Sequence, residues 1–255
     1  MNTPIDVLGR SAALLRAVAA REPGGATTTQ IAADTDLPRP TVHRLLVALE
    51  REGLAERIAG TANWVLGTEL YLLGRTASAR YDISDLARPF VQLLAHRTEE
   101  SAFFSVRRGD ETICLIREDG SFPIRSHVLY EGIRFPLGVA SAGLAVLAHM
   151  REAEISAFLS RADLERDFGP AHADPQIRGR VADARRRGWA LNAGHIVEGS
   201  WGMGAPVFDS AGQPRWALSL TGVAQRFSGE RQAEYGRLLL EAAHQLTQRI
   251  TNRGE

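Results

Sequence analysis

One short polar segment of this sequence, residues 39–44, carries the side chains with the clearest chemistry. It reads Arg-Pro-Thr-Val-His-Arg, and an arginine guanidinium can donate two hydrogen bonds to the O6 and N7 atoms of guanine. Threonine can also bond base edges in the major groove. The segment opens a predicted helix, and this end of the helix contacts bases in helix-turn-helix proteins. We therefore expect base contacts from Arg39, Thr41, His43 and Arg44.

Five further polar residues are suited to the DNA backbone or the minor groove. Thr27 and Thr29 lie at the start of a predicted short helix, where free backbone amides already favour anions. Arg57, Thr61 and Asn63 belong to a predicted hairpin that follows the base-reading helix. Together the two groups predict contacts with phosphate, sugar or the minor groove.

The apolar pattern predicts that residues 40–52 form the helix that presents these side chains. Pro40 suits the first turn, because its missing N–H would have no intrahelical partner. On the opposite side, four apolar residues recur at the spacing of one helical face and predict a buried stripe: Val42, Leu45, Leu46 and Leu49. A face of polar residues is then left to enter the major groove.

Neighbouring elements complete the pattern of a winged helix-turn-helix. A capping box is predicted where a threonine of the run 27–29 precedes Gln30, and this box would start a helix over residues 28–35. The hairpin after the base-reading helix is the predicted wing. Further elements are predicted at residues 5–20, 54–58, 63–66 and 68–80.

The charge balance gives only weak support to DNA binding. The chain has 30 basic residues, all of them arginine, and 30 acidic residues. Residues 1–80 hold nine arginines and eight acidic residues, a net charge of +1. Neutrality argues against non-specific nucleic-acid binding but allows a local patch. Glu50, Glu52 and Glu56 would repel phosphate, so a winged helix that binds protein instead of DNA stays an alternative, and His43 equally fits a solvated surface.

Beyond a predicted boundary near residues 76–84, strands and helices mix with antiparallel neighbours, which is an α+β layout. Helices are predicted over residues 83–98, 140–149, 152–160, 175–187 and 229–250. Strands are predicted over residues 101–108, 112–118, 123–129, 202–209 and 214–222. Residues 209–213 join the last two strands as a hairpin turn.

Composition and motifs argue against several other classes of protein. No run of about 18 apolar residues predicts a membrane span, and no signal peptide is recognised, so we expect a cytoplasmic protein. The single cysteine, Cys114, lies among apolar residues and is expected to be buried and inert. His195 with Glu198 is a weak metal or acid–base signal without partners, and His172 is expected on a surface loop. We therefore predict no catalytic residues, no metal and no cofactor, with an enzyme as a remote alternative.

Residues 7–67 resemble the DNA-binding domain of the IclR family of bacterial transcriptional regulators. The resemblance rests on the stretch IAADTDLPRPTVHRLLVALEREGLAER and on NWVLG, where the family usually has an aromatic residue, one further residue and Leu-Gly. The second half resembles the same family independently. The segments that carry that likeness are RFPLGVASAGLAVLA, RRRGWALNAGHIVEGSWGMGAPVFD and PRWALSLTG.

This resemblance implies three regions: a winged helix-turn-helix over residues 1–67, a linker helix over 68–84, and a GAF-like effector domain over 85–255. The effector domain is expected to be an antiparallel sheet flanked by helices. Family members form dimers or dimers of dimers, bind palindromic operators and mostly repress genes for the catabolism of organic and aromatic acids. We therefore expect double-stranded DNA, a small organic acid and further copies of the chain as partners, and no membrane.

The resemblance also implies an effector site in the second half. A turn of small residues that opens a helix is expected to bind a carboxylate through its amides. His127 is expected on a strand beside that turn, and Ser219 and Thr221 are expected on one face of another strand. The positions carried over from the family are Ser141, Ala142, Gly143, Asn192, His195, Gly202, Ser219 and Thr221.

Several of these positions depart from the usual family residue. Asn192 replaces an aspartate, His195 a glutamate, Gly202 a cysteine and Leu144 a lysine. These changes predict a roomier, less acidic pocket that binds an anion larger than a two-carbon acid. Apolar walls, and hence an aromatic acid, are expected from Trp201, Met203, Phe135 and Trp216. Alternatively the tryptophans pack in the core and the histidines are structural.

Overall fold

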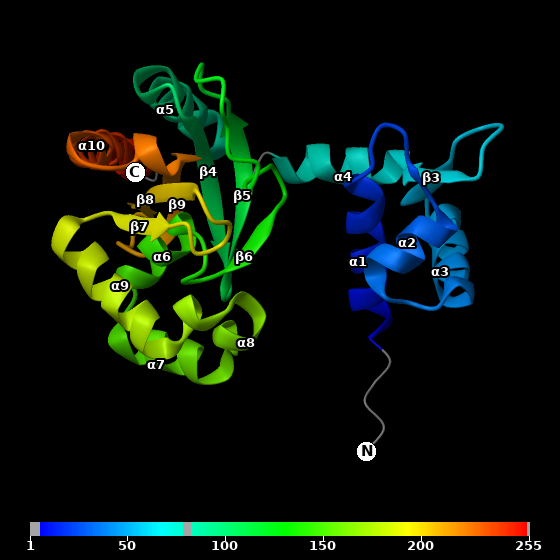
Figure 1. Cartoon of the computed structure of the whole chain (residues 1–255). Coiled ribbons are helices and arrows are strands. Elements are labelled where there is room, and N and C mark those ends of the chain that lie inside the picture. The colour runs from blue at the N-terminus through cyan, green and yellow to red at the C-terminus, as the bar shows by residue number, and fades with distance from the viewer. Residues whose placement is uncertain (1–5, 79–82, 254–255) are drawn as a thin grey trace. The chain divides into compact units, whose positions relative to one another are not determined.

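The computed structural model describes residues 6–78 and 83–253, and the chain separates into two compact units, residues 1–81 and 82–255 (Figure 1). The predicted domain boundary and the end of the predicted linker fall partly on residues 79–82, which lie outside the described residues. The first residue of the predicted helix 5–20 also lies outside them.

The first unit is a winged helix-turn-helix, as the sequence predicts. Its core gathers one buried face from each of three helices around Trp64. The capping box is formed by Thr27, whose hydroxyl accepts from the Gln30 amide while the Gln30 side chain accepts from the Thr27 amide. Its elements are α1 (Val7–Ala19), β1 (Ala26–Thr27), α2 (Thr28–Thr35), α3 (Arg39–Arg51), β2 (Ala55–Arg57), β3 (Asn63–Leu66) and α4 (Thr68–Ser78).

The second unit is built on an antiparallel sheet. In its described part the sheet has six strands, in the order β6-β5-β4-β9-β8-β7. In the centre of β8 and β9, Gly202 pairs with Thr221, and Gly204 pairs with Ser219. The strands are β4 (Ser101–Arg108), β5 (Glu111–Glu118), β6 (Arg134–Pro136), β7 (Ala190–Ala193), β8 (Ser200–Phe208) and β9 (Pro214–Val223).

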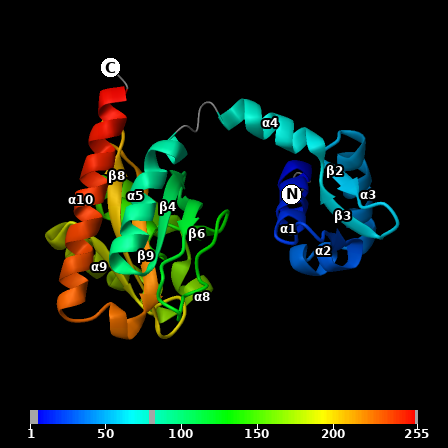
Figure 2. The same cartoon turned by 90° about the horizontal axis from the view of Figure 1, so that it is seen from above.

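Helices cover both faces of this sheet. On one face, α5 and α10 lie side by side and bury the apolar side of the central strands (Figure 2). On the other face, α6 packs against β8 and β9, and α9 packs against α6 and β7. The helices are α5 (Ile83–Thr98), α6 (Ser141–Ala148), α7 (Glu152–Arg161), α8 (Leu164–Phe168), η1 (Pro170–His172), α9 (Asp174–Arg187), η2 (Ala224–Arg226) and α10 (Glu230–Arg253).

One predicted strand was wrong. Residues 123–129 form no strand, and the sheet edge beside β5 is occupied by β6 instead. The segment is held by side chains: Arg125 donates to the Asp119 carboxylate at 3.0 Å, and Glu131 accepts from the Arg117 amide at 3.2 Å. Because no backbone ladder fixes it, its apolar residues do not follow a strand period. The short elements β1, β7, α8, η1 and η2 were not predicted.

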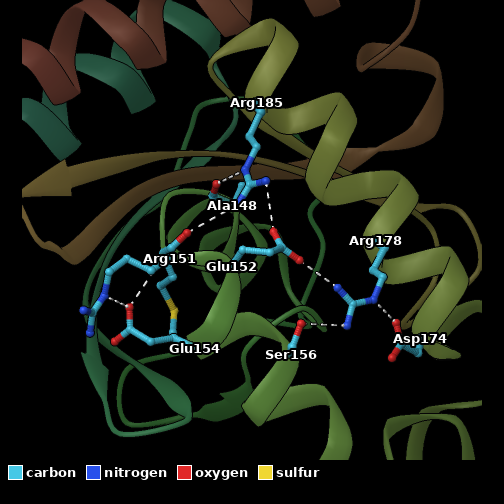
Figure 3. Close-up of polar contacts among 9 residues, drawn as sticks. Ala148, Arg151, Glu152, Glu154, Ser156, Asp174, Arg178 and Arg185 are labelled. Atoms are coloured by element: carbon cyan, nitrogen blue, oxygen red, sulfur yellow. Dashed lines mark hydrogen bonds and ion pairs between the residues drawn. The ribbon is translucent and has the colours of Figure 1, made fainter.

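A polar network joins α9 to the end of α6 and the start of α7 (Figure 3). The Glu152 carboxylate accepts from Arg178 at 2.9 Å and from Arg185 at 3.3 Å. Arg185 also donates to the Ala148 carbonyl at 2.7 Å, and Arg178 donates to Asp174 at 2.5 Å. This network fixes the helices that lie behind the predicted effector site.

Candidate DNA-binding surface and effector cavity

The start of α3 presents an exposed basic face. Val42, Leu46 and Leu49 are buried in the core of the first unit, which orients the helix. Arg39, His43 and Arg44 are exposed on its other side. Within the described residues, neither arginine makes a side-chain hydrogen bond or ion pair with the protein. Their donors are therefore available to a ligand.

The remaining predicted DNA contacts divide into available and engaged side chains. Thr29 is exposed and Thr41 is half-buried. Thr27 is already used in the capping box of α2. Thr61 donates to the Ile58 carbonyl at 3.0 Å, and Asn63 donates to the Gly24 carbonyl at 2.9 Å. Thr27, Thr61 and Asn63 thus stabilise the local fold through these hydrogen bonds. Only their remaining hydrogen-bonding capacity is available to DNA.

Arg57 links the wing to the end of α3. Its guanidinium lies 4.3 Å from the centre of the Trp64 ring and 3.4 Å from the Glu50 carboxylate. Trp64 is buried and its ring nitrogen donates to the Thr28 hydroxyl at 3.0 Å. The stacked guanidinium stays about half exposed, so it can meet a phosphate without leaving the ring.

A small, partly open cavity lies where the start of α6 meets β8 and β9. Its volume is about 20 Å³, which is room for roughly one water molecule. The predicted residues Ser141, Asn192, Trp201, Gly202 and Thr221 line it. Its other lining residues, which sequence reasoning missed, are Val128, Leu129, Ala140, Ile196 and Ser200. Most of these belong to segments without regular structure, where no periodic signal exists.

The pocket is therefore smaller than predicted, and the glycines of β8 explain why. A Cβ atom at Gly202 would lie 3.0 Å from the Ser141 hydroxyl, and one at Gly204 only 2.7 Å from the Ser141 carbonyl oxygen. The space that a side chain would take at residue 202 is thus occupied by α6 itself. Glycine at residue 202 thus allows the helix to approach the sheet and does not enlarge the cavity.

The polar groups around the cavity are unequally satisfied. Asn192 is buried, donates to the Val139 carbonyl at 2.7 Å and accepts from the His195 amide at 3.0 Å. Its side chain therefore holds two cavity-forming segments together. In contrast, the hydroxyls of Ser219 and Thr221 are buried without a hydrogen-bond partner. Buried unpartnered hydroxyls are costly. Thr221 lines the cavity, so its hydroxyl is suited to a polar ligand there, whereas the predicted residue Ser219 is fully buried and is not among the lining residues.

An open groove of about 580 Å³ lies next to the cavity and shares Val128 and Ser200 with it. The hydroxyls of Ser126 and Ser200 are hydrogen-bonded across 2.6 Å where the two spaces adjoin. His127 is exposed and lines the groove, and its predicted place on a strand was wrong because residue 127 lies in a loop. The loop that replaces the predicted strand carries it outward.

Other predicted effector residues lie away from the cavity. Met203 is fully buried in the core on the α5 and α10 face, because neighbouring strand residues point to opposite faces. Ala142 packs in the α6 core, and a Cβ at Gly143 would face Leu137 at 3.3 Å. Trp216 packs on the α5 and α10 face of the sheet. Phe135 packs against the core that contains Leu137 and α6, at the edge of the sheet.

Two histidines lie together behind Asn192. The ring centres of His172 and His195 are 6.2 Å apart. His172 is 1% exposed, so its expected place on a surface loop was wrong: η1 packs it beneath Phe168. Burial and the nearby charge of Arg180 lower the pKa of both histidines. Both rings are therefore disposed to be neutral at neutral pH.

The expected inertness of Cys114 agrees with its surroundings, since burial raises the pKa of its thiol to about 12. Across the ranges 6–78 and 83–253, no group of three His, Cys, Asp or Glu side chains is placed to hold a metal ion. In the same ranges, no helix is both long and apolar enough to cross a membrane.

Family models match both units. The model of the IclR helix-turn-helix domain matches residues 7–59, and that of the bacterial transcriptional regulator IclR C-terminal domain matches residues 75–248. The chain belongs to the IclR family of bacterial transcriptional regulators. It is accordingly a DNA-binding regulator of transcription and not an enzyme.

Individual IclR proteins align over most of the chain. The HTH-type transcriptional regulator BhcR of Paracoccus denitrificans is 31% identical over 88% of this chain and 80% of its own length. The transcriptional repressor IclR of Escherichia coli is 23% identical over 88% and 82%. An IclR homologue of Microbacterium hydrocarbonoxydans, solved in complex with 4-hydroxybenzoate, is 25% identical over 98% and 100%, with a TM-score of 0.76.

Proposed function

We propose that this IclR-family protein is a homo-oligomeric repressor that binds a palindromic operator and responds to a small organic acid. It controls genes of small-molecule catabolism, and an aromatic acid is the first candidate effector. The observation that carries DNA reading is the exposed, unengaged pair Arg39 and Arg44 at the start of α3. Two such helices, one from each protomer, read half-sites about one helical turn apart, roughly 34 Å.

The effector is proposed to enter through the open groove and to occupy an enlarged form of the cavity. Two features favour an acid: the uncapped start of α6 and the unpartnered hydroxyl of Thr221. Backbone amides at a helix start stabilise negative charge. An aromatic acid is supported by the 4-hydroxybenzoate bound to the Microbacterium relative. Separation of Ser126 from Ser200 would join groove and cavity.

Self-association is supported by exposed apolar residues on α4. Tyr71, Leu72 and Leu73 are each more than half exposed, at 63%, 51% and 52%. Neighbouring large apolar side chains on a helix surface are typical of a protein interface. We propose that α4, within the predicted linker 68–84, contributes to the contact between copies and transmits the effector signal. Coupling of acid to operator is expected to be about 1–3 kcal/mol.

The test is a titration of fluorescent DNA from upstream of the protein's own gene, with and without a panel of aromatic and aliphatic acids. Saturable binding that weakens steeply with salt is expected, because phosphate contacts release counterions. One acid should weaken or strengthen binding by the coupling above. Folded protein that binds neither this DNA nor a genomic operator library at low salt would favour a winged helix that binds protein instead.

A further inference from the structure

Arg180 of α9 is a half-buried cation, and two of its donor atoms are buried. Its Nη2 donates to the Ala171 carbonyl at 2.8 Å, whereas Nε and Nη1 are buried and meet no acceptor. No carboxylate of the described residues lies within ion-pair distance of it. An unpaired buried charge is strongly destabilising, and an arginine cannot relieve this by losing its proton. A bound anion would therefore stabilise this guanidinium.

The other four arginines of α9 are arranged differently: Arg187 lies 5.2 Å from the centre of the Trp189 ring, and the remaining three are paired with acids. Arg178 and Arg185 are paired in the Glu152 network, and Arg186 is paired with Asp183. All three point to partners at the surface of the unit, where their side chains are at least 39% exposed. Among the five arginines of α9, only Arg180 has buried donor atoms without a partner.

Two histidines lie near Arg180: Arg180 donates to the carbonyl of the residue before His172, and the ring centres of His172 and His195 are 6.2 Å apart. His172 comes from η1 and His195 from the loop after β7, and the charge of Arg180 acts on both rings. His172 Nδ1 lies 3.0 Å from the Phe168 carbonyl and must donate to it, while the buried Nε2 has no partner in hydrogen-bond geometry. The Val139 carbonyl also favours the protonated ring, so an anion would compete with it for the Nε2 proton. Nε2 becomes a donor only when the ring takes up a proton.

We propose that Arg180, His172 and His195 form a binding site for a small oxygen-bearing anion. The Arg180 guanidinium supplies the permanent charge and hydrogen-bond donors. His172 takes up a proton from solvent as the anion binds, and this creates the Nε2–H donor. A carboxylate or a phosphate oxygen fits these three side chains, because they supply hydrogen-bond donors and positive charge and include no negatively charged group.

The anion has two possible sources with the same chemistry. It is a free ion, or it is the carboxylate end of the organic acid of the proposed function. The second source is structurally close, because the His195 amide donates to Asn192, and Asn192 and Ile196 line the cavity. In either case the anion would contact the loop after β7, whose residue Ile196 lines the cavity. Only the second source rests on the proposed function.

The test follows the ring signals of His172 and His195 by NMR in the full-length protein labelled in histidine. Sodium acetate, inorganic phosphate and 4-hydroxybenzoate are titrated separately, up to tens of millimolar. Binding at the proposed site moves both histidines together and raises their titration midpoints. Shifts with acetate or phosphate identify a free anion, and shifts with 4-hydroxybenzoate alone identify the carboxylate of an organic acid.

Variants assign the site to Arg180. Arg180→Gln should weaken the anion that binds by roughly thirtyfold or more, as expected when one partner of a buried charge pair is removed. Arg180→Lys, which keeps the charge, should retain part of the affinity. Arg186→Gln removes a surface arginine of the same helix and should change nothing. Far-UV circular dichroism and a thermal melt check that each variant is folded.

Histidine signals that no probe moves, or anion affinity equal in Arg180→Gln and the native protein, would overturn the proposal and leave a water-filled polar site. The proposed function fails separately. An acid that still releases DNA from Arg180→Gln upholds the function and rejects the second source. Anion shifts at the histidines with no effect of any acid on DNA uphold the site and reject acid sensing.

Discussion

The proposed DNA-binding surface of the first unit and the proposed effector cavity of the second unit differ in how far each is already formed. At the start of α3, Arg39 and Arg44 are exposed and unengaged on a helix fixed by its buried face. At the start of α6, the space is about 20 Å³ and two hydroxyls are buried without partners. One surface is ready to bind, and the other must open first. Mutations should therefore affect affinity directly in the first and stability or coupling in the second.

The largest effect is expected from removing the ready surface. Arg39→Ala with Arg44→Ala should abolish specific operator binding, because each arginine that bonds a guanine contributes roughly 1–3 kcal/mol of base discrimination. Binding to random DNA should fall much less. Arg10→Ala, an exposed arginine of α1, is the matched control. Competition titrations with specific and random DNA measure the ratio, and an unchanged ratio in the double variant would contradict base reading by α3.

A single added methyl group should disrupt the close packing of α6 on β8 beside the cavity. Gly204→Ala would place a Cβ 2.7 Å from the Ser141 carbonyl oxygen, so α6 must move away from β8. Overpacking of this kind should lower the free energy of unfolding by about 1–3 kcal/mol.

The matched control is Gly179→Ala in α9, where nothing lies within 4 Å of the new Cβ. It should raise stability by up to about 1 kcal/mol through helix propensity. Urea unfolding followed by tryptophan fluorescence compares the two variants. Equal stabilities would mean that the close approach of α6 is not tight.

A smaller effect is expected from pH between about 7 and 5.5, through two histidines of the second unit. The pKa values of His172 and His195 are below the ordinary value of about 6.5. The unfolded chain therefore binds more protons than the folded chain, and stability falls as pH drops from about 7 to 5.5. His195→Gln should flatten this dependence, whereas the exposed His96→Gln should not. If His195→Gln left the change of unfolding free energy with pH unaltered, these histidines would not be its cause. An anion bound at Arg180 should make that change with pH smaller.

The smallest effect is expected in the wing. Thr61→Ala removes the hydrogen bond to the Ile58 carbonyl and should cost at most about 1 kcal/mol of operator affinity. The loss should be uniform across DNA sequences, because a turn residue orders the wing and does not read bases. A change in sequence preference, measured with a panel of altered operators, would instead assign Thr61 a direct base contact.

Sequence reasoning succeeded where local chemistry determines structure. The 3.6-residue period of Val42, Leu46 and Leu49 and the Thr27–Gln30 capping box predicted the first unit closely. Both signals act within a few residues of each other, so no tertiary information is needed. The paired strands β8 and β9 were predicted for the same reason, through their hairpin turn.

The effector site was harder to predict because its geometry depends on distant segments. The role of Gly202 follows from the position of Ser141, some 60 residues earlier in the chain, and not from the size of its own side chain. His172 was placed at the surface because its sequence neighbours are typical of loops, yet η1 packs it against Phe168. The lack of an ion pair at Arg180 also could not be predicted from the sequence. Acidic residues lie near it along the chain, and only the folded structure shows that none of the described ones reaches it.

The close approach of α6 to Gly202 and Gly204 also bears on timing. A ligand of benzoate size cannot enter a space for one water, so association waits for the helix or its neighbouring loop to move. The rate of sensing is then set by the frequency of opening, and it saturates as the acid concentration rises. A repressor built in this way would respond no faster than this opening allows, however much acid is present.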